Sequence, residues 1–225
     1  MNSTPQTPDP RPVYAAAAEQ LFQLISTVRP GHLDLPTPCD AYDVRALLGH
    51  VVSGARRIAT VPGGGDGVGE EVPEWIGEVP AERWAKLYDE GRARVNAAWS
   101  NDAVMDAVVT VPWGSMPGRI AMAGSVMETV THTWDLARAL ERDDTLDEGP
   151  AHFALAAARR ALPAEGREGA PFGEARQVPE DAGVYVRLAA WLGRDPEWRI
   201  PSVEGRPGGV RGRAGRNSSE NPPIA

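Results

Sequence analysis

The sequence predicts an all-α protein, an antiparallel four-helix bundle with a short hairpin and a small C-terminal helical extension. Three observations lead to this fold class. Four segments carry apolar residues at the spacing of one helix face, and one short stretch before the last of them reads as extended. The longest connection is rich in glycine and acidic residues, which favours a loop between helices.

The first two helices have the most regular apolar stripes. The first begins at Pro12, a residue suited to the first helical turn, and ends at Pro30 and Gly31. In the second helix we expect Asp40 to be the cap and Asp43 to add negative charge near the start. The stripes consist of Ala17, Leu21, Leu24, Ile25 and Val28, and of Val44, Leu47, Leu48, Val51, Val52, Ala55 and Ile58.

Residues 60–79 form the long connection, with the sequence TVPGGGDGVGEEVPEWIGEV. Its glycines match neither the dinucleotide-binding spacing nor a phosphate-binding loop, which would end in Gly-Lys-Ser/Thr. The connection is therefore either a lid over a site or a plain linker between helices.

The remaining elements follow in order along the chain. We expect a third helix over 81–100, an extended piece over 106–118, a fourth helix over 119–141, and shorter helices over 151–162 and 181–192. These elements predict one helical domain over 12–200, with a core bundle at 12–142 and an extension at 143–200. Composition predicts disorder for residues 1–11 and for the tail at 201–225.

Composition excludes several classes of protein. The net charge of −8 argues against a nucleic-acid-binding surface. No apolar run reaches the roughly 18 to 20 residues that span a bilayer. Cys39 is the single cysteine, so no intramolecular disulfide can form, and a cytoplasmic location is expected. For Cys39 we favour a structural role over that of a nucleophile.

The fourth helix carries Glu128, His132 and Asp135 at positions i, i+4 and i+7 of one stripe. One interpretation is a solvated face. The alternative is a buried metal site, because the only charged residues between Ile120 and Leu140 are Glu128, Asp135 and Arg138. Buried charges must be paired or bind a metal, so this charge-poor helix favours the second interpretation.

A third ligand would have to come from another helix. His50 is flanked on its helix by the small residues Ala46, Gly49, Ser53 and Gly54, which leave room for a neighbour. A histidine in such a place is a surface residue, a hydrogen-bonded buried residue or, beside Glu128 and His132, the natural third ligand. We expect surface positions for the two other histidines, His32 and His152.

Two signature motifs and a closing segment resemble a known family. TPCDAYDVRALLGHVV is similar to the first signature of DinB-like metal-binding proteins, and more narrowly to the N-terminal domain of mycothiol-dependent maleylpyruvate isomerases. VPWGSMPG and METVTHTWDLARA resemble the second signature, and QVPEDAGVYVRLAAWLGRDPEW the closing segment of small members of the group. The resemblance covers about residues 13–198 and implies a divalent metal held by His50, Glu128 and His132. Tyr42 stands where the family usually has tryptophan.

The resemblance also implies a chemistry. Two imidazoles and a carboxylate leave an open position, as in catalytic zinc sites, where a thiol can be activated. We expect zinc, with nickel or another transition metal as alternatives, and mycothiol as the cosubstrate of an S-transferase or isomerase acting on an electrophile. Asp135 would orient His132, serve as a fourth ligand, or pair with Arg138.

Other interpretations stay open. The protein could be a non-catalytic metal- or small-molecule-binding sensor, carrier or vestigial enzyme, or a bundle without metal, and it could be a monomer or a homodimer. No counterpart of the isomerase's separate C-terminal domain is recognisable in the sequence.

Overall fold

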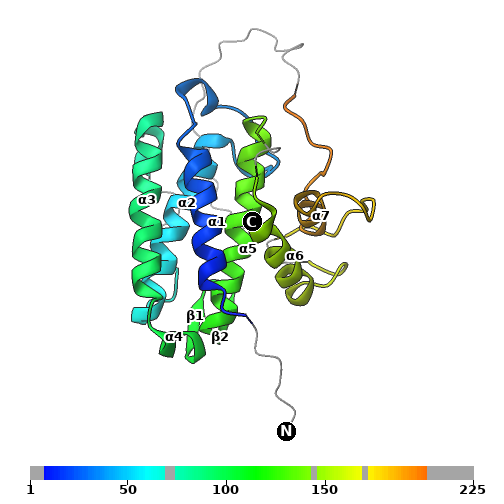
Figure 1. Ribbon diagram of the computed structural model, residues 1–225. Coiled ribbons are helices and arrows are strands. Elements are labelled where there is room, and N and C mark those ends of the chain that lie inside the picture. Colours follow the sequence, from blue (N-terminus) through cyan, green and yellow to red (C-terminus); the bar gives the residue numbers. More distant parts are fainter. Residues whose placement is uncertain (1–7, 69–73, 143–145, 169–171, 202–225) are drawn as a thin grey trace.

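The computed structural model describes residues 8–68, 74–142, 146–168 and 172–201 (Figure 1). Its elements are α1 (Arg11–Ile25), α2 (Val44–Thr60), α3 (Ala81–Ala98), α4 (Asp102–Asp106), β1 (Val108–Val111), β2 (Gly114–Pro117), α5 (Gly118–Ala139), α6 (Glu148–Ala161) and α7 (Val184–Trp191), with the 3₁₀ turns η1 (Pro30–His32), η2 (Val61–Gly63) and η3 (Glu74–Glu78). The predicted all-α class with one hairpin is confirmed. Of the predicted disordered tails, residues 1–7 and 202–225 lie outside the described residues, and α1 already begins at Arg11.

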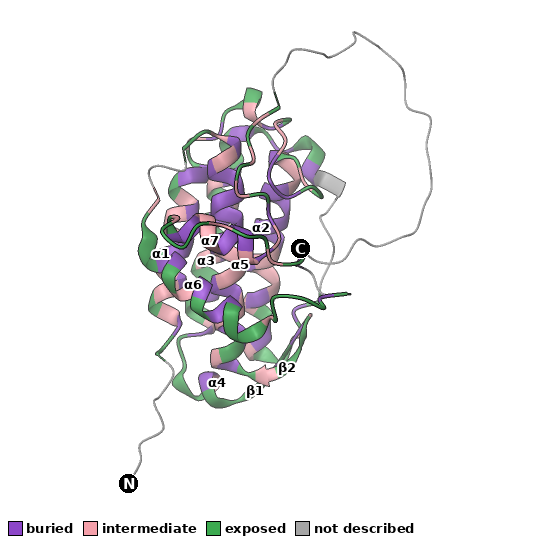
Figure 2. Cartoon of the chain, turned by 90° about the vertical axis from the view of Figure 1, so that its right-hand side faces the viewer, coloured by how far each residue is buried: buried purple, intermediate pink, exposed green. Residues whose placement is uncertain are grey.

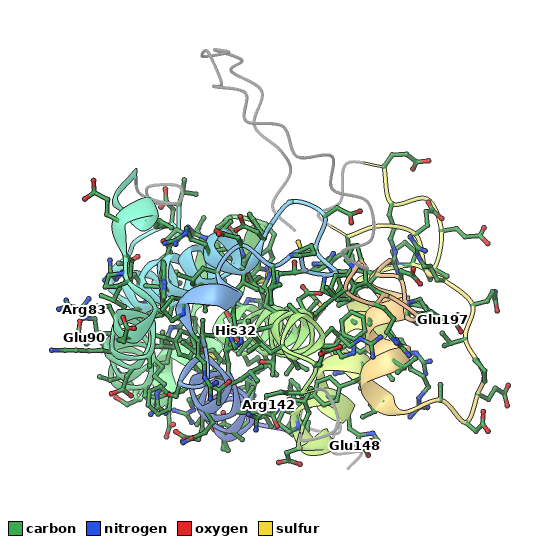
Figure 3. The ribbon with its side chains drawn as sticks, turned by 90° about the horizontal axis from the view of Figure 1, so that it is seen from above. His32, Arg83, Glu90, Arg142, Glu148 and Glu197 are labelled. Carbon is green, nitrogen blue, oxygen red and sulfur yellow. The ribbon has the colours of Figure 1, made fainter. Side chains whose placement is uncertain are left out.

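Helices α1, α2, α3 and α5 form the bundle, and Figure 3 shows them from above with α6 and α7 to one side. Helices α1 and α2 each pack between α3 and α5. The indole of Trp99 donates to the Ile58 carbonyl at 3.0 Å, so α2 and α3 end side by side. Arg11 pairs with Asp102 at 2.6 Å, so α1 starts where α3 ends.

Two of the four neighbouring helix pairs are therefore antiparallel, α1 with α3 and α2 with α5. The other two pairs, α2 with α3 and α1 with α5, are parallel. The long connection after α2 carries the chain back along the bundle, so that α3 starts beside the start of α2. The prediction of an antiparallel bundle is thus correct for two pairs only.

The start of α2 differs from the prediction. The cap is Asp43, whose carboxylate accepts a hydrogen bond from the Ala46 backbone N–H at 2.8 Å; Asp40 is exposed in the preceding turn. Thr37 explains the shift, because its hydroxyl donates to the Tyr42 carbonyl at 2.7 Å and closes that turn. The helix can begin only after the turn is complete.

The described end of the long connection is docked on α2. Ile76 is buried and packs against Gly49, where an added Cβ would lie 2.2 Å from the Ile76 side chain. The Arg45 guanidinium donates to three carbonyls of this segment, those of Ile76, Gly77 and Val79, the last at 3.1 Å. Residues 69–73 lie outside the described residues.

The chain between α3 and α5 forms α4, which the sequence did not predict, and then the hairpin. In the antiparallel register Val108 pairs with Pro117 and Val111 with Gly114. Gly118 opens α5 against α4, and a Cβ there would lie 2.1 Å from the Val104 carbonyl oxygen, so glycine is required.

The extension of α6 and α7 packs against the bundle, with α6 lying on α1 and α5 and α7 on α6 and α5. Buried residues concentrate on the faces that meet in the interior, as Figure 2 shows. Within the described part of the chain, no helix has both the length and the apolar character required to cross a membrane.

Candidate metal centre

Three residues from two helices converge between α2 and α5. One ligand atom each from His50, Glu128 and His132 can be chosen so that all three lie within 4.8 Å of one another. The two imidazole rings meet edge to face with centroids 4.9 Å apart. His50 and His132 are only 4% and 1% exposed, so the open interpretation of this stripe as a solvated face is wrong.

His132 is oriented by a buried ion pair. Its Nδ1 lies 3.0 Å from an oxygen of Asp135, one turn further along α5. An ionised carboxylate only accepts hydrogen bonds, so Nδ1 carries the hydrogen and the lone pair of the neutral ring is on Nε2. Arg194 donates to both oxygens of Asp135, at 3.1 and 3.2 Å. Asp135 therefore pairs with Arg194 rather than with Arg138.

His50 has a different, neutral support. Its Nδ1 lies 3.2 Å from the Tyr42 hydroxyl, and the two rings stack with centroids 5.0 Å apart. Its Nε2 lies 3.1 Å from Glu128 Oε1. The side chain of Glu128 is 24% exposed, which makes it the most accessible of the three.

The space beside Glu128 is left open by a small residue. A Cβ built on Gly54 would lie 3.8 Å from Glu128 Oε1 and 4.0 Å from the Arg57 guanidinium. A side chain at position 54 would meet both the Glu128 carboxylate and the Arg57 guanidinium, and glycine leaves this space free. This is the small-residue face of α2 that the sequence indicated.

The electrostatics favour neutral imidazole beside ionised carboxylates. Burial lowers the pKa of His50, although its hydrogen bond to Glu128 opposes the shift. Burial alone would raise the pKa of Glu128, but the hydrogen bond from His50 and nearby positive charge outweigh it and lower the pKa. Burial likewise acts to raise the pKa of Asp135, and the charge of Arg194 reverses the sign. Neutral His50 and anionic Glu128 are the protonation states that metal binding needs.

The other candidates lie elsewhere. His32 is in η1 at one end of the bundle (Figure 3), where its Nδ1 accepts a hydrogen bond from the Arg29 backbone. His152 is exposed on α6. Cys39 is buried at 1% exposure, and burial raises the pKa of its thiol, which suits a structural role better than that of a nucleophile.

Sequence reasoning missed two supporting residues. Arg194 follows α7 in a loop, and its spacing gives no sign that it reaches α5. The one available signal was the charge balance, because a buried Asp135 requires a cation. Tyr42 was interpreted as an aromatic replacement alone, and its hydroxyl contact with His50 was not anticipated.

A DinB-like helical bundle with a His-Glu-His cluster defines the class of this protein. The model of the mycothiol maleylpyruvate isomerase N-terminal domain matches residues 14–137. The chain belongs to this family, as the resemblance of its motifs implied.

The relatives found by sequence are two uncharacterized proteins of Mycobacterium tuberculosis, from strains CDC 1551 / Oshkosh and H37Rv. Each is 29% identical over 192 residues, which cover 83% of this chain and 98% of the relative. The match spans nearly the whole of each relative, and neither name gives an activity.

Two solved structures share the fold. A mycothiol-dependent maleylpyruvate isomerase matches with a TM-score of 0.66 at 14% identity, over 92% of this chain and 97% of the isomerase. A histidine-to-alanine mutant of a mycothiol-dependent maleylpyruvate isomerase matches with a TM-score of 0.53 at 14% identity, over 70% of each chain. The likeness in fold therefore extends beyond residues 14–137 and takes in almost all of the isomerase chain, although the sequence showed no counterpart of its C-terminal domain.

Proposed function

We propose that this protein binds a divalent metal through His50, Glu128 and His132 and uses it to activate a small-molecule thiol. The observation that carries the proposal is the convergence of these three side chains within 4.8 Å. The reaction would be transfer of a thiol to an electrophile, or an isomerisation assisted by the thiol.

The residues fit a metal ion. Two ligand atoms held about 2.0–2.2 Å from one zinc ion lie at most about 4.4 Å apart, so a small adjustment suffices. The donors are two imidazoles and one carboxylate, a set that suits zinc and also nickel or other transition ions. A half-buried carboxylate beside two buried imidazoles is otherwise difficult to explain as a packing arrangement.

The chain's own residues would prepare this site. Asp135 holds the hydrogen on Nδ1 of His132 and so directs Nε2 to the ligand cluster. Tyr42 steadies His50 through the other ring nitrogen. A divalent ion bound there would lower the pKa of a thiol, so that the reactive thiolate forms at neutral pH.

The thiol that we propose is mycothiol. The matching solved structure is named a mycothiol-dependent enzyme, and the family model carries the same name. We also propose that residues 12–200 act as one unit, core 12–142 with extension 143–200, because Arg194 of the extension pairs with Asp135 of the core. A free buried thiol at Cys39 is compatible with a cytoplasmic location.

Metal analysis of the purified full-length protein tests the proposal. We expect about one ion per chain in the wild type and none in His132→Ala, because two ligands do not retain a metal. His152→Ala is the matched control, since it removes an exposed histidine and should leave the metal in place.

Retention of metal by His132→Ala would overturn the proposed site. Consumption of mycothiol by the metal-loaded protein with a panel of electrophiles then separates an enzyme from a metal-binding protein without turnover.

A further inference from the structure

A small pocket enters the bundle beside the proposed ligands. It has a volume of about 30 Å³ and lies between α1, α2, α3 and α5, with Glu128 and His132 in its wall. This volume holds an oxygen-sized group or a water, and it is too small for a whole substrate. It can therefore take one functional group of a molecule that binds at the site.

Two tyrosines line this pocket, Tyr14 of α1 and Tyr88 of α3. Tyr14 and Tyr88 are 4% and 2% exposed. Among the described residues no hydrogen bond is found for either hydroxyl, and neither is one of the fully enclosed polar atoms, so both hydroxyls keep contact with accessible space. The hydroxyl of Tyr185, by contrast, donates to the Asp147 carbonyl at 3.0 Å. A phenol hydroxyl that lines a pocket and has no partner in the protein can donate to a polar group that enters the pocket.

The residues that line the pocket indicate which kind of functional group it can bind. Burial raises the pKa of Tyr14 and of Tyr88, so both remain protonated and can donate. The pocket residues include no arginine or lysine, and the Glu128 carboxylate would repel an anion. Leu21 and Ile58 supply apolar walls. A neutral oxygen acceptor fits these properties better than a carboxylate.

We propose that Tyr14 and Tyr88 form a subsite that binds a carbonyl oxygen of the electrophilic substrate. The inference rests on the proposed function, because it takes the electrophile to bind beside the metal ligands. Two phenol hydroxyls that donate to one carbonyl oxygen polarise the carbonyl and favour any negative charge that develops there. The substrate class would then be carbonyl compounds, with the reacting carbon near Glu128 and His132.

Thiol binding to the cobalt-loaded full-length protein tests this subsite. Mercaptoacetamide carries a carbonyl beside its thiol, and propanethiol is a probe of similar size without one. The ratio of their dissociation constants, measured from the sulfur-to-cobalt absorption band, reports recognition of the oxygen. We expect the wild type to favour mercaptoacetamide by about five- to tenfold, the usual effect of a hydrogen bond.

Tyr14→Phe and Tyr88→Phe should each lose most of this preference, while Tyr185→Phe, outside the pocket, should keep it. Circular dichroism checks that each variant is folded, and if Tyr88→Phe is not, Tyr14→Phe decides. An unchanged ratio in a folded variant, or no preference in the wild type, would overturn the subsite. Failure of the wild type to bind cobalt would instead overturn the proposed metal function, and this inference with it.

Discussion

The two histidines of the site are held by contrasting means. On the α5 side a chain of charged contacts runs from Arg194 through Asp135 to His132, and all three are buried. On the α2 side His50 faces Glu128 through Nε2, and its Nδ1 is held by a neutral group, the hydroxyl of Tyr42. A charged chain fixes one imidazole rigidly but commits the core to keeping every charge paired. Loss of a hydrogen bond to a neutral partner leaves no buried charge unpaired, so it lowers the free energy of unfolding much less.

The largest effect should follow from breaking the charged chain. Arg194→Met leaves the Asp135 carboxylate buried without its cation, and we expect the free energy of unfolding to fall by about 3–5 kcal/mol. Urea denaturation of the metal-free protein measures the loss. Combining Arg194→Met with Asp135→Asn should recover part of it, since no isolated charge then remains.

Arg176→Gln provides the control for this experiment. Arg176 also holds the chain next to Arg194, by donating to the Gly193 carbonyl at 2.9 Å, but it is exposed. We expect a change within about 0.5 kcal/mol. Equal losses in both variants would show that docking of the segment, and not the buried pair, accounts for the stability.

A second effect concerns metal affinity on the charged side. Asp135→Asn keeps the shape of the side chain but weakens its hold on Nδ1 of His132, so affinity should fall by about 10- to 100-fold. Competition with a chelator measures the constant. Asp147→Asn, at the cap of α6, should bind metal as the wild type does. Complete loss in Asp135→Asn would instead favour direct ligation by this carboxylate.

Tyr42→Phe should have a smaller effect, because it removes one neutral hydrogen bond and keeps the aromatic ring against His50. We expect metal affinity to fall by less than about tenfold in the same titration. A loss of metal affinity as large as that in Asp135→Asn would show that the supports of His50 and His132 do not differ in importance.

The smallest expected effect is a pH dependence of the free energy of unfolding that comes from His50. Since burial lowers the pKa of His50, the unfolded state binds more protons than the folded state between the lowered pKa and the ordinary value of 6.5. The free energy of unfolding of the metal-free protein should therefore fall as pH drops through this window. His50→Gln should reduce that slope and exposed His152→Gln should not; equal slopes in all three proteins would refute the assignment.

Particular residues show how far the sequence alone could lead. Glu128, His132 and His50 could be singled out because a charge-poor helix and a small-residue face are local patterns, and two motifs supported them. The parallel helix pairs could not be predicted, because helix direction depends on the path of the connection over 61–80. The role of Arg194 could not be predicted either, because only the folded chain brings it to Asp135.

The distance along the chain between Asp135 and Arg194 has a consequence during synthesis. The two residues are 59 positions apart, and translation at about 5–20 residues per second places Arg194 roughly 3–12 s behind its partner. Throughout this interval the nascent helix α5 carries a carboxylate whose cation has not yet been made. The interior around Asp135 can therefore close with its charge paired only after Arg194 has been synthesised.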